Sequence, residues 1–349
     1  MARLRKSDCS GPGIRRRRRG KGFEYVDDDG KKVSEPEVLE RIDELRIPPA
    51  WKDVWICPYP FGHLQATGVD AAGRKQYLYH QRWRERRDQE KFDEMIDFAR
   101  ALPLMRKRVA RDLRGKQMSR ERVLACAVRL LDLGFFRVGG EDYAVENESY
   151  GLATMRKEHV TVERSGAITF DYPAKSGQRR VQSVVDDDVY DVVKRLKRRR
   201  GGGDELLAYQ VGRRWRDIKS PDINEYVKRV TGGDFSAKDF RTWNATVLAA
   251  VALSVSGQAT QSKTARKRAM TRAVKEVAHY LGNTPAVCRA SYIDPRVFDR
   301  FQGGLTIGGV LPMLVDVETD NASLQGAVEE AVIDLIAEDV RSPALEKVA

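Results

Sequence analysis

The pattern of apolar residues changes near residue 90 of this 349-residue chain, and the change limits the folds that it can adopt. Before that point, short segments rich in β-branched and aromatic residues are separated by proline or glycine, as in VWICPY, HLQATGVD and RKQYLYHQ. Such segments are typical of antiparallel strands joined by tight turns. Beyond it, apolar residues recur at helical spacing, beginning with QEKFDEMIDFARAL. The pattern predicts an α+β protein, with a small antiparallel β-rich domain at residues 23–90 and a mainly α-helical domain at residues 91–349.

The second part of the chain carries the clearest helix and strand signals. In SRERVLACAVRLLDLG, Ser119 can cap an amphipathic helix that Gly134 ends. Ser236 and Asp239 open another helix with a capping-box pattern. Between these helices, HVTVE, AITFDYP and RRVQSVV predict a three-strand β meander. Near the C-terminus, SLQGAVEEAVIDLIAEDV predicts an acidic amphipathic helix that packs on the rest of this domain.

The chain is strongly basic, and this charge concerns its partner more than its fold. It has 63 Lys and Arg against 51 Asp and Glu, a formal net charge of +12. Such a surplus is typical of proteins that bind a polyanion, such as DNA, RNA or an anionic membrane surface. Five consecutive arginines, Arg15–Arg19, lie within residues 1–22, which we expect to form a flexible basic arm. The alternative is that the run is only a solvated stretch of charge.

The sequence carries no signal for a membrane span, secretion, a metal or a nucleotide cofactor. No apolar run reaches the length of about 18 residues that a span requires, and the basic N-terminus lacks the apolar segment of a secretory signal. The 4 cysteines and 4 histidines are scattered, with no CxxC pair. Neither GxxxxGK[ST] nor a GxGxxG between a strand and a helix occurs. We therefore expect a cytoplasmic protein without a metal or nucleotide cofactor.

Five polar residues have the chemistry for phosphoryl transfer without a metal. The stretch LGNTPAVCRASYIDP places Tyr292 after a short helix that Thr284 can cap, and a phenol can attack phosphorus. Arginines stabilise charge on phosphate oxygens, and a general acid must protonate the leaving oxygen. The candidates for these tasks are Arg137 just past an amphipathic helix, Arg241 on the polar face of another, Lys175 at a hairpin tip and Asn283 near the tyrosine.

Each of these residues also has a purely structural interpretation. Arginines beside helix ends usually cap carbonyl groups or pair with surface acids. A lysine in a glycine-rich turn is normally just exposed, and a lone tyrosine usually packs in the core or at the surface. Singly the signals are weak, and their order and local context are what favour catalysis.

Long stretches of the sequence resemble the type IB DNA topoisomerases, in particular the compact bacterial enzymes of the poxvirus type. The resemblance covers nearly the whole chain, including IRRRRRGKGFEYVDDDG, RIPPAWKDVWICPYPFGHLQATGVDAAGRKQYLYH, FRVGGEDYAVENESYGLATMRKEHV, KDFRTWNATVLAA and LGNTPAVCRASYIDPRV. It implies a monomer that binds double-stranded DNA in the bacterial nucleoid and relaxes supercoils without ATP or a metal. It also implies that the β-rich and helical domains form a C-shaped clamp around the duplex.

The same resemblance implies roles for the five candidates. Arg137, Lys175, Arg241 and Tyr292 match the family's catalytic arginine, lysine, arginine and tyrosine. Tyr292 is then the nucleophile that forms a 3′-phosphotyrosyl link, and Lys175 is the general acid. The nicked strand swivels about its partner, releases supercoiling and is resealed. Asn283 matches a position that is histidine in the poxvirus and eukaryotic members; it can donate to phosphate but carries no positive charge.

A DNA-contacting strand is implied for the segment GRKQYLYHQRW. The residues expected to face DNA are Arg74, Lys75, Gln76, Tyr77 and Tyr79. Tyr77 and Tyr79 alternate onto one face of a strand, so this face can meet a groove. The alternative is that one or both tyrosines belong to the core of the domain.

Other functions remain open from the residues alone. Tyrosine recombinases use the same Arg, Lys, Arg and Tyr, but KDFRTWNAT has Lys238 where recombinases usually have histidine, and their N-terminal domain is helical. A non-catalytic, architectural DNA-binding protein would explain the charge but has no use for Tyr292. The sequence contains no RRM or KH signature that would indicate RNA binding.

Overall fold

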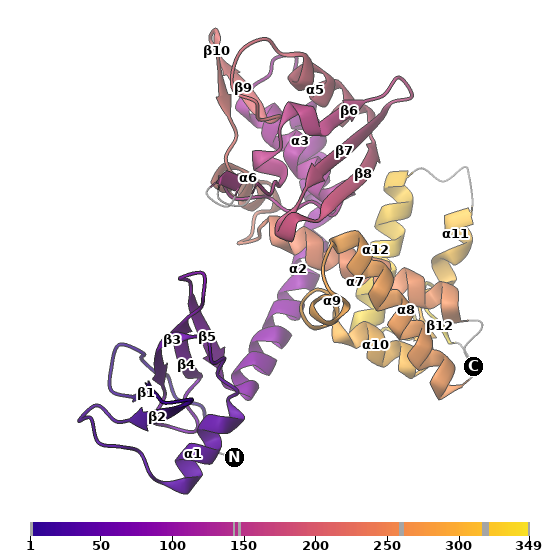
Figure 1. Cartoon of the computed structure of the whole chain (residues 1–349). Helices are drawn as coiled ribbons and strands as arrows, with labels where there is room; N and C mark the ends of the chain where they lie inside the picture. The colour runs from indigo at the N-terminus through magenta and orange to yellow at the C-terminus, as the bar shows by residue number, and fades with distance from the viewer. Residues whose placement is uncertain (1–2, 142–143, 146–147, 258–261, 316–320, 348–349) are drawn as a thin grey trace. The chain divides into compact units, whose positions relative to one another are not determined.

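The computed structural model describes residues 3–141, 144–145, 148–257, 262–315 and 321–347 (Figure 1). The chain divides into two compact units, Met1–Phe92 and Asp93–Ala349, and the division lies close to residue 90. Both units combine helices with antiparallel sheets, which confirms the prediction of a mixed α and β protein. No helix in the described part of the chain is long and apolar enough to cross a membrane.

The first unit is built on a five-stranded antiparallel sheet with the strand order β2-β1-β3-β4-β5. The three strands that the sequence predicts are present as β3, β4 and β5. Ile42 of helix α1 packs against Val54, Ile56 and Ala66 of the sheet to form the core of this unit. The elements are β1 (Ile14–Arg19), β2 (Gly22–Val26), α1 (Pro36–Glu44), β3 (Lys52–Ile56), β4 (Leu64–Val69) and β5 (Lys75–Tyr79).

The arginine-rich segment is a strand and not a flexible arm. β1 pairs along most of its length with β2 and, at its start, with β3. Gly20, between β1 and β2, has a φ of 57°, which glycine adopts without strain, and it helps to close a tight hairpin. Ile14 is buried in the core. The flexibility expected for residues 1–22 was therefore wrong for Ile14–Arg19, because sheet pairing on both sides holds this segment.

The second unit is mainly helical, and its described residues form three small sheets (Figure 1). The predicted meander is confirmed as β6-β7-β8, whereas the β9-β10 hairpin and the short β11-β12 pair were not predicted. Its strands are β6 (Val160–Val162), β7 (Ala167–Pro173), β8 (Arg179–Val185), β9 (Ala208–Val211), β10 (Arg214–Asp217), β11 (Leu305–Thr306) and β12 (Glu346–Lys347). Its helices are α2 (Gln81–Leu113), which begins in the first unit, α3 (Arg120–Leu133), α5 (Asp187–Arg198), α6 (Ser220–Thr231), α7 (Ala237–Gly257), α8 (Lys263–Leu281), α9 (Pro285–Ser291), α10 (Pro295–Gln302), α11 (Leu311–Val315) and α12 (Asn321–Ala337).

Helix α3 lies at the centre of the core of the second unit. It contacts α5, α6 and α7, and Leu124 and Leu130 are fully buried. The Ser119 hydroxyl accepts the backbone N–H of Arg122 at its start, and Gly134 follows its end. Both predicted ends of this helix are confirmed. Because Gly134 stops α3 here, the chain that follows turns toward the end of α8.

A sharp connection between α8 and α9 brings the candidate tyrosine into place. Gly282 ends α8 with a φ of 62°, in the left-handed region that favours glycine. The Thr284 hydroxyl then accepts the backbone N–H of Val287 at 3.3 Å and caps α9, whose first residue is Pro285. This cap is the one that the sequence predicts. Tyr292 follows the last residue of α9 directly.

The acidic C-terminal segment forms α12 and packs on the rest of the second unit. Val332 and Leu335 are buried in the same core as α3. Glu329 accepts a hydrogen bond from Arg106 at 2.7 Å, and Arg106 also binds Asp132 at 2.8 Å. Burial acts to lower the pKa of Arg106, but its bonds to the two carboxylates raise that pKa above its ordinary value. The helix is thus held by apolar packing and by one largely buried charge network.

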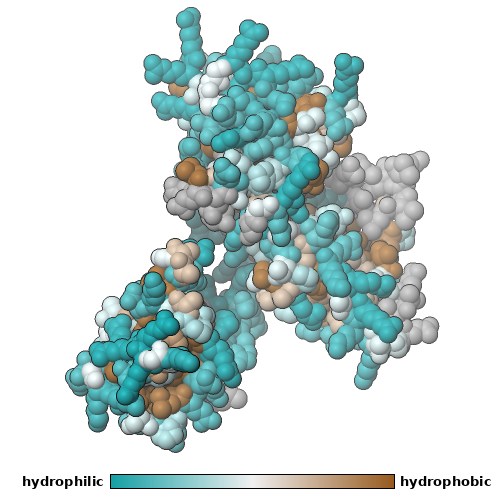
Figure 2. Space-filling view, in the orientation of Figure 1, coloured by the Kyte–Doolittle hydropathy of each residue, from teal (hydrophilic) through white to brown (hydrophobic). Residues whose placement is uncertain are grey.

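The surface of both units is rich in polar side chains. Hydrophilic residues cover much of the face shown in Figure 2, with apolar residues scattered among them. Arg15, Arg17, Arg18 and Arg19 of β1 are all exposed. Most of the positive charge of β1 is therefore accessible to a polyanionic partner, although Arg19 also pairs with Glu24.

Candidate active site

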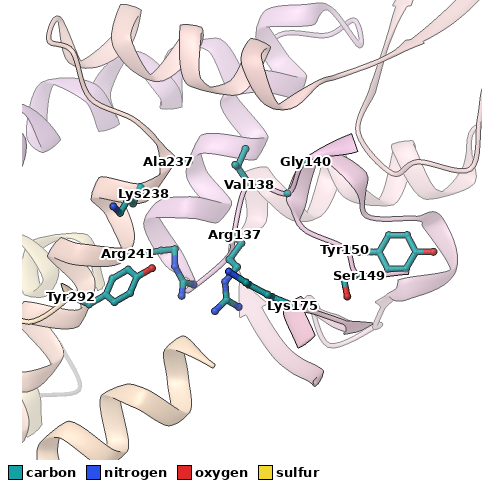
Figure 3. Close-up of a pocket in the computed structure, with 11 residues that line it drawn as sticks. Arg137, Val138, Gly140, Ser149, Tyr150, Lys175, Ala237, Lys238, Arg241 and Tyr292 are labelled. Atoms are coloured by element: carbon teal, nitrogen blue, oxygen red, sulfur yellow. The ribbon is translucent and has the colours of Figure 1, made fainter. Parts of the chain in front are cut away.

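A cavity of about 300 Å³ in the second unit brings together four of the five candidate catalytic residues (Figure 3). Arg137 follows α3, Lys175 begins the turn between β7 and β8, Arg241 belongs to α7 and Tyr292 follows α9. No Asp or Glu is among the described residues that line it, so its cations face no carboxylate there. The other lining residues are Val138, Gly139, Gly140, Ser149, Tyr150, Ala237 and Lys238.

Tyr292 is held by its backbone while its phenol faces the cavity. Its N–H donates to the carbonyl of Cys288 at 3.0 Å, and its own carbonyl accepts the Thr246 hydroxyl at 3.3 Å. The guanidinium carbon of Arg241 lies 5.5 Å from its ring centre. In Figure 3 the phenol oxygen points toward the Arg241 side chain. The residue is only partly buried, so a ligand in the cavity can reach the hydroxyl.

Arg241 is a buried cation with neutral hydrogen-bond partners. It is 3 % exposed and donates to the carbonyls of Phe135 at 2.5 Å and Leu281 at 2.9 Å. Burial first, and then the nearby charge of Arg137, lower the pKa of Arg241 to about 10, although Tyr292 opposes this shift. The side chain is therefore still charged at neutral pH. A desolvated cation that is held by carbonyls attracts an anionic ligand strongly.

Arg137 fixes the orientation of the Asn283 amide. Its Nη2 donates to the carbonyl of Gly282 at 2.9 Å and to Oδ1 of Asn283 at 2.6 Å. Because a guanidinium can only donate, the atom that it meets must be the amide oxygen. The amide nitrogen of Asn283 is then buried, with no hydrogen-bond partner among the described residues. A buried donor in this state is costly until an acceptor reaches it. Asn283 does not line the cavity, but this bond ties it to a residue that does.

Three arginines from different elements donate to the last carbonyls of α8. The C-terminal end of a helix carries partial negative charge, and a nearby cation contributes about 0.3–1 kcal/mol there. The structural interpretation of Arg137 and Arg241 as helix caps is therefore correct for this structure. It is compatible with catalysis, because the capping bonds hold the guanidinium groups beside one cavity. The pairs are Arg180 with His279 and Tyr280, Arg241 with Leu281, and Arg137 with Gly282.

Lys175 lies at the tip of the β7–β8 hairpin, where the sequence places it. It begins a single 3-10 turn, Lys175–Gly177, and Gly177 has a φ of 69°. The side chain is exposed and lines the same cavity as Arg137 (Figure 3). An exposed lysine on a hairpin tip combines a long flexible stem with a charged end that can reach a bound ligand.

The expected DNA-contacting residues lie in the first unit, on and beside the edge strand β5. Two of them share one partner: Arg74 pairs with Asp70 at 3.0 Å, and Gln76 donates to the same carboxylate at 2.8 Å. The ammonium of Lys75 lies 5.8 Å from the ring centre of Tyr77. The turn before β5 and the start of this strand thus present a cluster of donors at one edge of the sheet.

The two tyrosines of β5 differ in burial. Tyr77 is 45 % exposed, and its ring stacks on that of Tyr79 with 6.1 Å between the ring centres. Tyr79 stacks in turn on Trp83 at 4.4 Å and packs against the cluster that contains Trp55 and Leu64. Tyr79 therefore has a structural role in the first unit, whereas Tyr77 presents its ring to solvent.

Some polar residues of the site were not among the candidates. Lys238 lines the cavity one helical turn before Arg241, and this three-residue spacing on α7 was a usable signal in the sequence. Ser149 and Tyr150 reach the cavity from a loop that has no periodic pattern. Arg180 had no comparable signal, because its partners depend on how the β7–β8 hairpin meets α8.

Comparison with known proteins identifies the same family in both parts of the chain. Residues 80–303 match the family model described as "Eukaryotic DNA topoisomerase I, catalytic core". Residues 22–70 match the one described as "Bacterial DNA topoisomerase IB, N-terminal domain". The first match covers most of the second unit and every candidate residue of the cavity.

Individual relatives agree with these matches. The chain is 32% identical over 297 residues to a DNA topoisomerase 1B of Acanthamoeba polyphaga mimivirus, covering 83% of this chain and 88% of the viral protein. It is 33% identical over 131 residues to a DNA topoisomerase 1 of Candidozyma auris, covering 37% of this chain and 16% of that protein. A DNA topoisomerase 1 of Schizosaccharomyces pombe is 30% identical over 142 residues, covering 40% of this chain and 16% of that protein.

The extent of these matches decides between the functions that the residues alone left open. The family model spans the helices and the hairpin that build the cavity, and the viral relative is similar along most of both chains. This argues against a tyrosine recombinase and against a non-catalytic architectural protein. The chain belongs to the type IB DNA topoisomerase family.

Proposed function

We propose that Tyr292 is the nucleophile with which this DNA topoisomerase cuts one DNA strand and relaxes supercoils. The observation that carries the proposal is the cavity, which groups the Tyr292 phenol with Arg137, Arg241 and Lys175 and has no carboxylate among its described lining residues. Guanidinium groups recognise phosphate oxygens through paired hydrogen bonds. Such a cavity suits a phosphodiester of the DNA backbone.

The reaction exchanges one phosphate ester for another. The Tyr292 oxygen attacks phosphorus and loses its proton, while the 5′-oxygen of the next nucleotide leaves and gains one. The cut end is then held as a 3′-phosphotyrosyl ester, and the free end rotates about the intact strand. The 5′-hydroxyl attacks the ester, expels the tyrosine and reseals the strand. Because the phosphotyrosyl ester conserves the bond energy, the cycle has no need of ATP.

Arg137, Arg241 and Asn283 stabilise the phosphate at the transition state. Charge is then spread over the phosphate oxygens, and donors already held in place stabilise it without reorganisation. The carbonyl bonds of Arg137 and Arg241 supply this preorganisation. Asn283 offers the amide nitrogen, which has no partner among the described residues when Arg137 holds the amide oxygen. This neutral donor contributes a hydrogen bond but neither charge nor a proton.

Lys175 is the general acid that protonates the leaving 5′-oxygen. In an in-line displacement the nucleophile and the leaving group lie on opposite sides of phosphorus. In Figure 3, Arg137 and Arg241 lie between Tyr292 and Lys175, an order that supports this assignment. The exposed hairpin tip also allows the ammonium to adjust to bound DNA.

Duplex DNA is held mainly through its phosphates, by residues of both units that close around it as a C-shaped clamp. In the first unit, β5 and the turn before it contribute Arg74, Lys75, Gln76 and Tyr77, while Tyr79 stacks on Tyr77 and supports its ring. The exposure of Tyr77 and the donors around Asp70 support this role. Affinity is expected to fall steeply with salt because each phosphate contact releases counterions. The enzyme acts as a monomer on the DNA of the bacterial nucleoid, without a metal.

Covalent trapping tests the nucleophile assignment. The protein is incubated with an end-labelled duplex, and the reaction is stopped with SDS. The expected adduct joins the protein to the 3′-phosphate end of the cut strand. Tyr292→Phe is expected to bind DNA with unchanged affinity and to form no adduct. Tyr150→Phe serves to test the second tyrosine of the cavity, and Tyr280→Phe is a control outside it. An adduct in Tyr292→Phe, or its loss only in Tyr150→Phe, would remove Tyr292 from this role.

A further inference from the structure

Arg180 is the third arginine at the end of α8, and it has no role in the proposed reaction. It lies on β8 opposite Tyr172 of β7. Its Nη1 donates to the carbonyl of His279 at 2.8 Å, and its Nη2 donates to the carbonyl of Tyr280. Both acceptors belong to the last turn of α8. The side chain therefore connects the hairpin that carries Lys175 to the helix that leads to Asn283 and Tyr292.

This connection is made close to the hairpin tip. The turn that begins with Lys175 is followed by β8, and Arg180 is the second residue of that strand. Among the hydrogen bonds of the described residues, those of Arg180 are the ones that join the β7–β8 hairpin to α8. On its other side the hairpin is tied to the cavity loop, where the Tyr150 N–H donates to the Pro173 carbonyl at 2.8 Å. The tip is thus held between the loop and α8.

The fit of Arg180 against α8 is close. A Cβ added to Gly282 would lie 3.3 Å from Nη1 of Arg180, so the guanidinium packs directly over this glycine. The carbonyl of the same glycine accepts the hydrogen bond from Arg137. Arg180 and Arg137 therefore meet the end of α8 at one point, from the hairpin and from the loop after α3.

Repulsion between the cations of the cavity makes a bond between the hairpin and α8 necessary. Lys175, Arg137 and Arg241 are cations around one cavity, and like charges repel the hairpin from the rest of the site until a phosphate enters. Carbonyls at a helix C-terminus attract a cation. Arg180 is a further cation close to Arg137 and Arg241, but its hydrogen bonds to the carbonyls of α8 attract the hairpin to this helix and offset the repulsion while the cavity is empty.

We propose that Arg180 is a positioning residue that docks the β7–β8 hairpin on the end of α8 and thereby sets the position of the Lys175 ammonium at the leaving 5′-oxygen. The inference rests on the proposed role of Lys175 as general acid. It predicts that loss of Arg180 impairs the protonation of the leaving group more than the attack by Tyr292. A misplacement of about 1 Å in a catalytic group can slow a reaction about 100-fold.

The neighbouring Arg179 provides a matched control. It is exposed and binds Asp171 of the same hairpin through two hydrogen bonds of 2.7 and 2.5 Å. Its contacts therefore stay within the hairpin, whereas those of Arg180 leave it. Arg179→Met and Arg180→Met remove the same charge from adjacent positions of one strand.

The test compares single-turnover cleavage of ordinary DNA with cleavage of DNA that has a 5′-bridging phosphorothiolate at the cut site. A thiolate leaves without a proton, so this substrate does not need the general acid. Arg180→Met is expected to cut ordinary DNA about 10- to 100-fold more slowly than wild type at saturating DNA. On the phosphorothiolate its rate is expected to return to within a few-fold of wild type. Arg179→Met is expected to match wild type on both substrates.

Lys175→Ala separates this inference from the mechanism that it rests on. If Lys175→Ala is not rescued by the phosphorothiolate, the general-acid assignment itself fails. If Lys175→Ala is rescued but Arg180→Met is equally slow on both substrates, Arg180 does not act through Lys175 and the inference is overturned. A wild-type rate for Arg180→Met on ordinary DNA also overturns it. Should Arg180→Met fold poorly, Arg180→Lys, which keeps one donor, is expected to show a smaller defect with the same rescue.

Discussion

Two groups of arginines in this chain share a residue type but differ in their surroundings. The first group lies on β1, where Arg15, Arg17, Arg18 and Arg19 are exposed on a sheet. The second group lies at the end of α8, where Arg137, Arg180 and Arg241 donate to backbone carbonyls. An exposed arginine keeps its rotamer freedom and can meet any nearby phosphate. An arginine held by carbonyls presents its charge in one place, which is what a transition state requires.

The comparison predicts separate effects on chemistry and on affinity. Carbonyl partners hold a guanidinium without neutralising it, so the α8 group keeps its charge for a phosphate in the cavity. The β1 group contributes to the field that attracts DNA and to contacts that salt weakens. Changes in the first group should therefore alter the cleavage rate, and changes in the second should alter binding.

The largest effect is expected from Arg241→Ala. Removal of one preorganised donor to a developing charge typically slows an enzyme by about 10²–10³-fold. We expect a loss of this size in single-turnover cleavage at saturating DNA, with the dissociation constant for DNA nearly unchanged. Arg17→Ala is the control that removes an equal charge from the exposed group. If Arg241→Ala cleaves at the wild-type rate, the arginines at the end of α8 do not act on the chemical step.

A smaller effect, on stability, is expected within β1 itself. Arg16 differs from its neighbours because it donates to the carbonyls of Ile47, Pro48 and Trp51. Arg16→Ala removes the donor that these three carbonyls share, although the Pro48 carbonyl keeps the Trp51 N–H, and is expected to lower the free energy of unfolding by about 1–3 kcal/mol. Arg17→Ala should change it by less than about 0.5 kcal/mol. Urea unfolding of the two variants measures the difference, and equal values would show that Arg16 is no different from the exposed arginines.

The smallest effect is expected from the exposed group. Arg15 and Arg17 lie on the same face of β1. The double variant Arg15→Ala/Arg17→Ala should weaken DNA binding and lower the slope of log affinity against log salt by up to about 0.9 for each lost phosphate contact. Its cleavage rate at saturating DNA should stay within about twofold of wild type, since neither residue belongs to the cavity. A slower chemical step with an unchanged salt slope would contradict the division between the two groups.

Local signals made much of the fold predictable. The Ser119 and Thr284 caps and the glycine after α3 are short-range features, and the structure contains each of them. Other features escaped, and for β1 the reason is that nonlocal pairing overrides local composition. β1 consists largely of arginines, and its backbone becomes a strand through pairing with β2 and β3. Helix α2 continues past Pro103, although proline removes one hydrogen bond of a helix.

The site was predictable as a set of residues but not as a geometry. Residue type and motif context singled out Arg137, Arg241, Lys175 and Tyr292, and these four share one cavity in the structure. The hydrogen bond from Arg137 to the Asn283 oxygen could not be predicted from the sequence, because it depends on how the loop after α3 packs against the end of α8. Arg180 was missed for the same reason.

Relaxation of supercoiled plasmid tests most directly whether Tyr292 forms the covalent link to DNA. Wild type and Tyr292→Phe are compared in EDTA without ATP, and reactions are stopped with SDS to trap adducts. Wild type is expected to relax the plasmid and to leave a protein linked to a 3′ end of DNA, whereas Tyr292→Phe is expected to bind DNA but to do neither. Relaxation or an adduct in Tyr292→Phe would contradict this expectation, as would tight binding by wild type with no relaxation and no adduct.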